Sequence, residues 1–312
     1  MSVKAWAAAG VCLALLGGFA AWLLVGRETS PPCNGLAENA SVQKSVGAAV
    51  HPGMSCAALG QAIVKATAGS EPGRHNQTQT QAMKDVLFAL GSGQSKQLDL
   101  DPALRVPIAT ALADYADVHE MLAGLDSTYV TKAGRDTPPW EAGGTHHLSV
   151  PANAFRKTLR AVAEDPQAYA LLRMAETRTA AGQLAAVPAD ATGSELSLPP
   201  TKNARALGIL DGIADAAISQ DAQEARKWHA AVFDRLITEQ ADQAEPAGRL
   251  TATWLQDLKN TPEQQRAERL RAQGLDMART WAQTRTMDEP TRQDLLTKVE
   301  NSARNAHEEV KH

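Results

Sequence analysis

The sequence predicts an all-α protein in which a single N-terminal transmembrane helix is followed by an exported multi-helix domain. Aromatic residues make up only 4% of the 312 residues, and alanine is abundant. No stretch shows the sustained alternation of apolar and polar side chains that a half-buried strand needs. Alanine favours closely packed helices, whereas β-sandwiches are rich in β-branched and aromatic residues.

Residues 5–26 form one uninterrupted apolar stretch without a charged side chain. As a helix, 22 residues at about 1.5 Å each extend about 33 Å, enough to cross a hydrocarbon core of ~30 Å. Trp6 and Trp22 stand near the two ends of the stretch, where indole rings prefer the membrane interface. We therefore expect a retained transmembrane anchor at residues 5–26, with Trp6 and Trp22 at the interfaces.

A cleaved signal peptide is the alternative interpretation of this stretch. Lys4 would be its basic region, and Gly18-Phe19-Ala20 its small-residue cleavage site. Cleavage there would leave the apolar residues 21–25 at the new N-terminus, which is an unusual start for a soluble protein. Cys12 lies in the middle of the stretch and Cys33 follows two prolines, so neither favours a lipid-modified cysteine.

The small residues Gly10, Ala14 and Gly18 are spaced four apart and would form one smooth face of the anchor. A second helix can approach such a face closely, so the spacing is compatible with self-association. An alanine-rich chain produces the same spacing without selection for pairing, and that simpler explanation is the stronger one.

Charges and cysteines indicate on which side of the membrane the remainder lies. Lys4 precedes the anchor, whereas Arg27 is followed at once by Glu28, so the positive-inside rule predicts cytoplasmic residues 1–4 and an extracytoplasmic C-terminal domain. Cys33 and Cys56 are the only cysteines beyond the anchor, and we expect a disulfide between them in an oxidising compartment. Two free thiols are the alternative.

Residues 27–125 are predicted to form a membrane-proximal helical region. Helices are expected over residues 36–50, 55–68, 81–90 and 102–125, with Ser55 and the pair Asp101-Pro102 at helix starts. The last of these helices carries a continuous stripe spaced three and four residues apart: Leu104, Ile108, Leu112, Tyr115, His119 and Leu122. We therefore expect one face of this helix to be buried.

Residues 126–150 contain proline and glycine pairs and are predicted to be a long loop between two halves of the protein. Residues 151–312 are predicted to form a second helical region. Its expected helices cover residues 151–163, 166–184, 201–219 and 221–240, with a loop over 187–200 and shorter helices after Pro246 and Pro262. The final segment contains about two heptads of apolar residues, too few to indicate a coiled coil.

Several helical motifs resemble a known group of proteins. They are Pro102-Ala-Leu-Arg-Val-Pro-Ile, Ala113-Asp-Tyr-Ala-Asp-Val-His-Glu-Met-Leu, Phe155-Arg and Val162-Ala-Glu-Asp-Pro-Gln-Ala-Tyr. Over residues 102–215 the chain is similar to a helical region of large uncharacterised proteins from high-GC Gram-positive bacteria, some of which are associated with WXG-type secretion. The resemblance implies an all-helical fold in a bacterial envelope. It assigns no activity to any residue.

The only acid/base candidates on a predicted helix surround His119. Asp114, Asp117 and Glu120 lie close to this histidine in sequence and could share its face. Their spacing does not match the two-histidine helix of zinc proteases. A single histidine in an apolar stripe is more often a buried structural residue, so we expect His119 to contribute to stability and not to catalysis.

His146 and His147 follow Trp140-Glu141 in the predicted loop, but adjacent side chains do not readily bind one metal ion. No phosphate-binding loop, dinucleotide fingerprint, nucleophile elbow or CxxC motif is present. Trp228, Trp254 and Trp281 are expected in the core. We therefore name no catalytic, cofactor-binding or metal-ligating residue.

The net charge of −4 gives no reason to expect nucleic acid as a partner. We expect a membrane-anchored extracytoplasmic helical module for interaction or assembly in a bacterial cell envelope, with a protein partner and no cofactor. The alternative is a membrane-tethered hydrolase with its site near residues 126–150. A pocket that gathers His119, His146 or His147 with carboxylates would favour the hydrolase.

Overall fold

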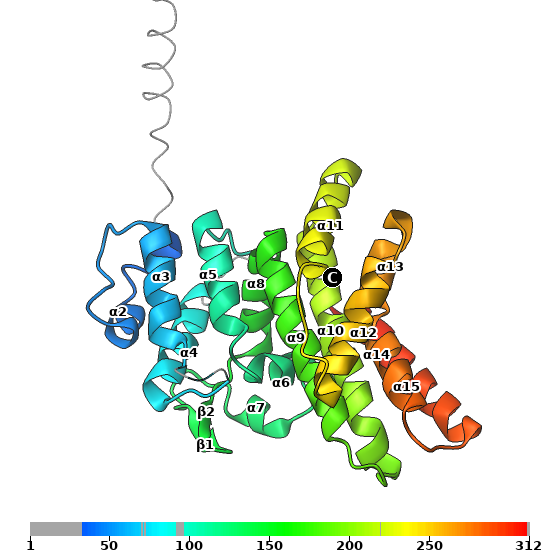
Figure 1. The fold of residues 1–312 in the computed structure, drawn as a ribbon. Helices are drawn as coiled ribbons and strands as arrows, with labels where there is room; N and C mark the ends of the chain where they lie inside the picture. The colour runs from blue at the N-terminus through cyan, green and yellow to red at the C-terminus, as the bar shows by residue number, and fades with distance from the viewer. Residues whose placement is uncertain (1–32, 70, 72, 92–96, 219, 311–312) are drawn as a thin grey trace, which may run out of the picture.

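The computed structural model describes residues 33–310 except 70, 72, 92–96 and 219. This part of the chain is predominantly helical, which confirms the predicted all-α class. The helices stand side by side and follow roughly the sequence order from one end of the molecule to the other (Figure 1). The predicted anchor, with Trp6 and Trp22, lies outside the described residues.

None of the helices in the described part of the chain is both long enough and apolar enough to cross a membrane.

The described part of the chain begins with a disulfide between Cys33 and Cys56, as predicted. Their Cα atoms lie 5.2 Å apart, and the bridge joins the 3₁₀ turn η1 (Cys33–Gly35) to the first residue of α3 (Cys56–Thr67). Ser55 caps α3, because its Oγ accepts a hydrogen bond from the Ala58 N–H at 3.3 Å. The predicted position of this helix is therefore confirmed.

Two neighbouring helices differ from their predicted bounds because of local capping. Helix α2 (Ala40–Val46) is shorter than the predicted 36–50, because Asn39 caps its start and Gly47, at φ 97°, ends it. Helix α4 (Gln77–Gly91) begins four residues before the predicted start at 81. Asn76 and Gln79 each accept a hydrogen bond from the other's backbone N–H, which forms a capping box.

The long helix predicted over 102–125 is two helices, α5 (Pro102–Leu112) and α6 (Asp117–Ala123). Asp101 caps α5 as predicted, and its Oδ1 accepts from the Ala103 N–H at 2.8 Å. The chain then turns at residues 113–116. Tyr115 within the break and His119 after it are nevertheless buried, so the apolar spacing runs through the break unchanged. Periodicity alone therefore could not locate the turn.

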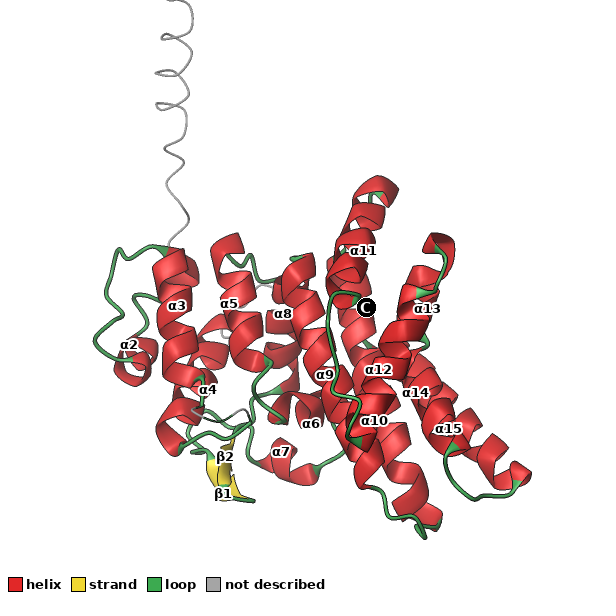
Figure 2. Ribbon diagram, viewed as in Figure 1, coloured by secondary structure: helices red, strands yellow, loops and turns green. Residues whose placement is uncertain are grey.

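The segment predicted as a loop over 126–150 contains a short helix, α7 (Ser127–Thr131), and a β-hairpin. Strands β1 (Trp140–Ala142) and β2 (Thr145–His147) pair antiparallel, with Trp140 opposite His147. Gly143 and Gly144 form the turn at φ 59° and 77°, which suits a two-residue hairpin connection. Figure 2 shows this hairpin at the lower edge of the helical array.

The C-terminal region consists of α8 (Ala152–Ala163), α9 (Pro166–Ala186), α10 (Gly193–Ala217), α11 (Ala222–Leu236), α12 (Pro246–Lys259), η2 (Glu263–Gln265), α13 (Arg266–Arg271), α14 (Gln273–Gln283) and α15 (Glu289–Glu309). Helices α8 and α9 pack on α4 and α5, so packing continues across residues 126–150. Asp165 caps α9 as predicted and accepts from the Gln167 and Ala168 N–H groups.

The loop predicted over 187–200 is wrong in its second half, because α10 begins at Gly193 and includes Pro199 and Pro200. Proline removes a backbone donor and usually interrupts a helix. Here Leu196 and Pro200 are buried on the inner face of the helix. The two prolines therefore lie in the first third of the longest described helix.

Helix α10 packs most extensively against the C-terminal helix α15. Gly208 lies against the backbone of Ala303, and Gly212 lies against the backbone of His307 and the side chain of Val310. The apolar residues of the final segment therefore face α10 of the same chain. Small residues at the crossing allow the two helix backbones to approach closely.

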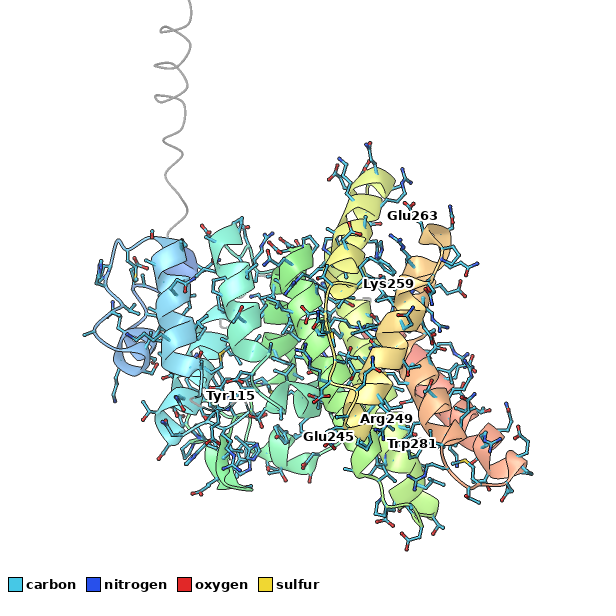
Figure 3. All side chains as sticks on the ribbon, in the orientation of Figure 1. Tyr115, Glu245, Arg249, Lys259, Glu263 and Trp281 are labelled. Carbon is cyan, nitrogen blue, oxygen red and sulfur yellow. A yellow bond between two sulfur atoms is a disulfide. The ribbon has the colours of Figure 1, made fainter. Side chains whose placement is uncertain are left out.

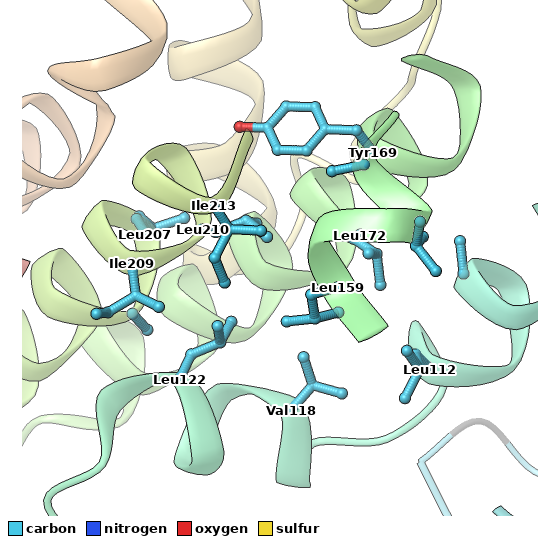
Figure 4. Packing of buried hydrophobic residues seen from close by; sticks show 14 of the residues in the cluster. Leu112, Val118, Leu122, Leu159, Tyr169, Leu172, Leu207, Ile209, Leu210 and Ile213 are labelled. Carbon is cyan, nitrogen blue, oxygen red and sulfur yellow. The ribbon is translucent and has the colours of Figure 1, made fainter. Parts of the chain in front are cut away.

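The hydrophobic core runs between α5, α6, α8, α9 and α10 (Figure 4). Leu159 of α8, Leu172 of α9 and Leu210 of α10 are each 1% exposed. Trp254 and Trp281 are buried as predicted, and Trp228 is partly buried, with its Nε1 donating to the Ala163 carbonyl at 3.0 Å. All three rings therefore pack against the core.

Candidate functional site

Residues 114–119, at the turn between α5 and α6, hold three acid/base side chains that contact three different parts of the fold. Asp114 pairs with His75 at 3.0 Å, before α4. Asp117 pairs with His147 of β2 at 2.7 Å, and His119 pairs with Glu176 of α9 at 2.9 Å. We call residues 114–119 the polar turn. It connects the loop before α4, the hairpin and helix α9.

The first of these contacts organises the loop that precedes α4. The Asp114 carboxylate accepts hydrogen bonds from the Gly69 and Gly73 N–H groups at 3.3 and 3.1 Å and from His75 Nε2. The His75 ring stacks on Tyr115 with ring centroids 3.7 Å apart. Burial raises the pKa of the Tyr115 hydroxyl well above its usual value, and this hydroxyl donates to the Thr67 carbonyl. The arrangement fixes the loop in place.

The second contact places His147 beside a buried carboxylate. His147 Nδ1 donates to Asp117 Oδ1, and its Nε2 lies 3.2 Å from the Ala142 carbonyl oxygen, so both ring nitrogens face acceptors. Only the imidazolium form carries a proton on each nitrogen. The hydrogen bond with Asp117 raises the pKa of His147, which agrees with this assignment.

The remaining polar groups near Asp117 do not form a nucleophilic site. Tyr129 donates its hydroxyl to Asp117 Oδ1 at 2.5 Å, and burial raises the pKa of that hydroxyl. Ser149 donates to the Tyr129 carbonyl at 2.6 Å and is only 1% exposed. Its oxygen is directed to backbone and closed to a substrate. The cluster therefore holds the hairpin on α6 and has no activated nucleophile.

The third contact is buried. His119 is fully buried and Glu176 is 2% exposed, and His119 Nδ1 donates to Glu176 Oε2. No partner within the described residues lies within hydrogen-bond distance of His119 Nε2. This environment matches the one expected for a structural histidine with one hydrogen bond. A reactive group would have no access to solvent here.

A cleft of about 660 Å³ lies beside the polar turn, between α3, α5 and α9. Its apolar wall includes Val64, Leu171 and Met174. Its charged lining residues are Asp114, Glu176, Arg178 and Glu239, and Glu239 pairs with both Arg178 and Arg235 at 2.9 Å. Three of the four charged lining residues are carboxylates, so the lining itself is acidic. Its volume lies in the range typical of ligand-binding clefts.

The sequence-based candidates have different positions in the structure. Asp114, Asp117 and His119 lie together in the polar turn, whereas Glu120 pairs with Lys202 at 2.5 Å on α10. His147 joins the Asp117 cluster, but its neighbour His146 contributes its backbone, donating to the His75 carbonyl. Neither His119, His146 nor His147 lines the cleft. Within the described ranges, no three His, Cys, Asp or Glu side chains are placed to hold a metal ion.

Three residues of this region were absent from the sequence-based set: His75, Tyr129 and Glu176. Each lies between 12 and 57 residues from its partner in the polar turn. No local spacing connects them, because the tertiary fold alone brings them together. In the sequence, the aromatic and histidine residues near the hairpin indicate only that a polar cluster could form there, and they do not indicate which residues pair.

No protein-family model, curated protein or solved structure matches this chain. The resemblance over residues 102–215 stays a prediction.

Proposed function

We propose that this protein is a membrane-anchored, extracytoplasmic helical module that binds a protein partner at a bacterial cell envelope. The Cys33–Cys56 disulfide is the observation that carries the proposal, because such bridges persist in oxidising compartments outside the cytoplasm. The apolar stretch over residues 5–26 precedes the bridge and supports a single-pass anchor. Lys4 supports a cytoplasmic N-terminus.

The cleft beside the polar turn supports a binding role. Its apolar wall can accept apolar side chains, and its excess of carboxylates complements a cationic group on the same partner segment. The Asp114 carboxylate accepts hydrogen bonds from two backbone N–H groups, so its charge is in a fixed position. A partner segment that contains apolar residues and a lysine or arginine would fit this lining.

The tethered-hydrolase alternative depends on the region around residues 126–150. His147 and Asp117 form a histidine–carboxylate pair there, but the nearby Ser149 hydroxyl donates to backbone and is buried. The cleft beside the polar turn is not lined by His147. These observations favour binding over hydrolysis as the role of this protein.

Protease treatment of intact spheroplasts tests the topology. A protease added outside should digest the helical domain of the full-length protein, with loss of a C-terminal epitope, while a cytoplasmic marker protein stays intact. Digestion only after the membrane is permeabilised would overturn the proposed orientation.

Site-specific photo-crosslinking in living cells tests the binding role. A photoreactive amino acid at Thr179, which lines the cleft, should give a discrete protein adduct. The same amino acid at the exposed position Gln293 of α15 is the matched control and should not give that adduct. Glu239→Lys reverses one charge of the cleft and should reduce the adduct at Thr179. An adduct of equal yield at both positions would contradict binding in the cleft.

A further inference from the structure

A second cleft, of about 360 Å³, lies between the C-terminal end of α9 and helices α12 and α14. Leu184, Leu250 and Trp281 form its apolar wall. Two arginines, Arg249 and Arg285, also line it, and no aspartate or glutamate does. Figure 3 shows Arg249 and Trp281 close to each other at the lower part of α12 and α14. This lining has a charge opposite to that of the first cleft and to the net charge of −4 of the chain.

Both guanidinium groups are positioned by backbone carbonyls instead of carboxylates. Arg285 donates from Nη1 to the Val187 carbonyl at 3.1 Å and from Nη2 to the Pro188 carbonyl, and it lies over the Trp281 ring at 4.8 Å. Arg249 donates from Nη1 to the Ala244 carbonyl at 2.8 Å. Within the described residues neither arginine forms an ion pair. Two oriented positive charges therefore border an apolar cleft.

We propose that this second cleft binds the C-terminal carboxylate of a polypeptide whose last side chain is apolar. Guanidinium groups bind carboxylates through paired, charge-assisted hydrogen bonds, which here would come from Arg249 and Arg285. The last side chain of the ligand would pack against Leu250 and Trp281. The inference concerns a site separate from the first cleft and does not depend on the membrane anchor.

The threonines of the cleft favour a peptide over a simple fatty acid. Thr284 lines the cleft, but its hydroxyl already donates to the Trp281 carbonyl at 2.7 Å. Thr253 and Thr280 also line the cleft and carry hydroxyl groups. A peptide backbone has amide and carbonyl groups that can bond to these hydroxyls, whereas a hydrocarbon chain would leave them unmatched. The volume of the cleft is at the small end of the range for ligand sites, which suits one or two terminal residues of a longer chain.

Titration calorimetry with the full-length protein in detergent tests the proposal. The probe is the tetrapeptide Ala-Ala-Ala-Leu with a free carboxylate, and its C-terminal amide is the matched ligand control. The free acid should bind at least about tenfold more tightly than the amide, which is the effect of one charge-assisted hydrogen bond. Octanoate, which has the carboxylate but no peptide groups, should bind more weakly than the free peptide.

Substitutions in and outside the second cleft test whether the peptide binds there. Arg249→Gln should weaken binding of the free peptide by at least about tenfold, and Arg249→Lys should retain part of the affinity. Arg226→Gln removes one exposed positive charge on α11 and should bind as the parent does. Thr253→Trp, which fills the cleft, should abolish binding independently of charge. Equal affinity for acid and amide, unchanged binding by Arg249→Gln, or preference for octanoate over the peptide would each overturn the proposal.

Discussion

At the scale of single residues, histidines next to carboxylates differ in how many acceptors surround the ring. His147 has an acceptor at each nitrogen, whereas the buried His119 has, among the described residues, a partner at Nδ1 only. Both rings connect distant segments, and the hydrogen bond with Asp117 raises the pKa of His147. The two residues therefore lead to different predictions.

The stability contributed by His147 should depend on pH. Its pKa is raised in the folded state, mainly by the hydrogen bond with Asp117. The contribution is therefore complete below the unfolded value of about 6.5 and is lost as the pH rises through the raised folded value. We expect the difference in unfolding free energy between the parent and His147→Gln to shrink from pH 5.5 toward pH 8.5, as measured by urea denaturation.

The exposed His51 provides the control for this measurement. His51→Gln should leave the pH dependence of unfolding as it is in the parent. A stability difference between the parent and His147→Gln that stays constant over the pH range would show that the His147 pair does not titrate as expected.

His119→Gln should reduce stability without removing the binding function. The substitution disturbs a fully buried hydrogen bond to Glu176, and loss of such a bond costs about 1–3 kcal/mol. Chemical denaturation should therefore show a lower unfolding free energy, while the folded variant still forms the crosslinked adduct at Thr179. A variant as stable as the parent that no longer forms the adduct would assign His119 to function instead.

At the scale of helices and strands, local chemistry and tertiary packing determine different features. Side-chain caps at Ser55, Asp101 and Asp165 start three helices at positions expected from the sequence. The break at residues 113–116 has no such signal, because Tyr115 within it and His119 after it maintain the apolar spacing. In the polar turn, Asp114 pairs with His75 before α4 and Asp117 pairs with His147 of β2. These contacts between distant segments stabilise the turn.

The close contact between α10 and α15 leads to a prediction for Gly208 and Gly212 of α10. A Cβ atom at Gly208 or Gly212 would lie under 3.0 Å from the carbonyl oxygen of Ala303 or His307, so alanine would force the helices apart. We expect Gly208→Ala and Gly212→Ala each to destabilise the protein by about 1–3 kcal/mol in denaturant unfolding.

Gly182 of α9 is the matched control, because no atom lies within 4 Å of a Cβ built at this helical position. Gly182→Ala should stabilise the protein by up to about 1 kcal/mol through helix propensity alone. If all three alanine variants had the same stability, close packing of α10 on α15 would not be the reason for glycine at positions 208 and 212.

At the scale of the whole molecule, the Cys33–Cys56 bridge joins the start of the described part of the chain to α3. Alkylation under denaturing conditions should label two more thiols after reduction than before it, as counted by intact mass. Closing 23 residues contributes about 3 kcal/mol in the loop-entropy model, so reduction should lower the denaturation midpoint. Equal labelling before and after reduction would contradict the bridge.

The all-α class, most helix starts and the cysteine pair could be predicted from the sequence alone. Composition, three-and-four spacing and caps act within a few residues, so each of these features has a local cause. The membrane anchor also rests on local composition and stays a prediction.

The polar turn, the hairpin packed against it and both clefts were decided by tertiary structure. His75, His147 and Glu176 reach residues 114–119 from 30 to 57 positions away in the chain, and no short spacing encodes such contacts. The carboxylates of the first cleft and the arginines of the second likewise come from separate elements. These charged side chains lie close together because burial of the apolar helix faces brings the elements together. The packing of the helices then determines where the polar groups at the edges of the apolar faces lie.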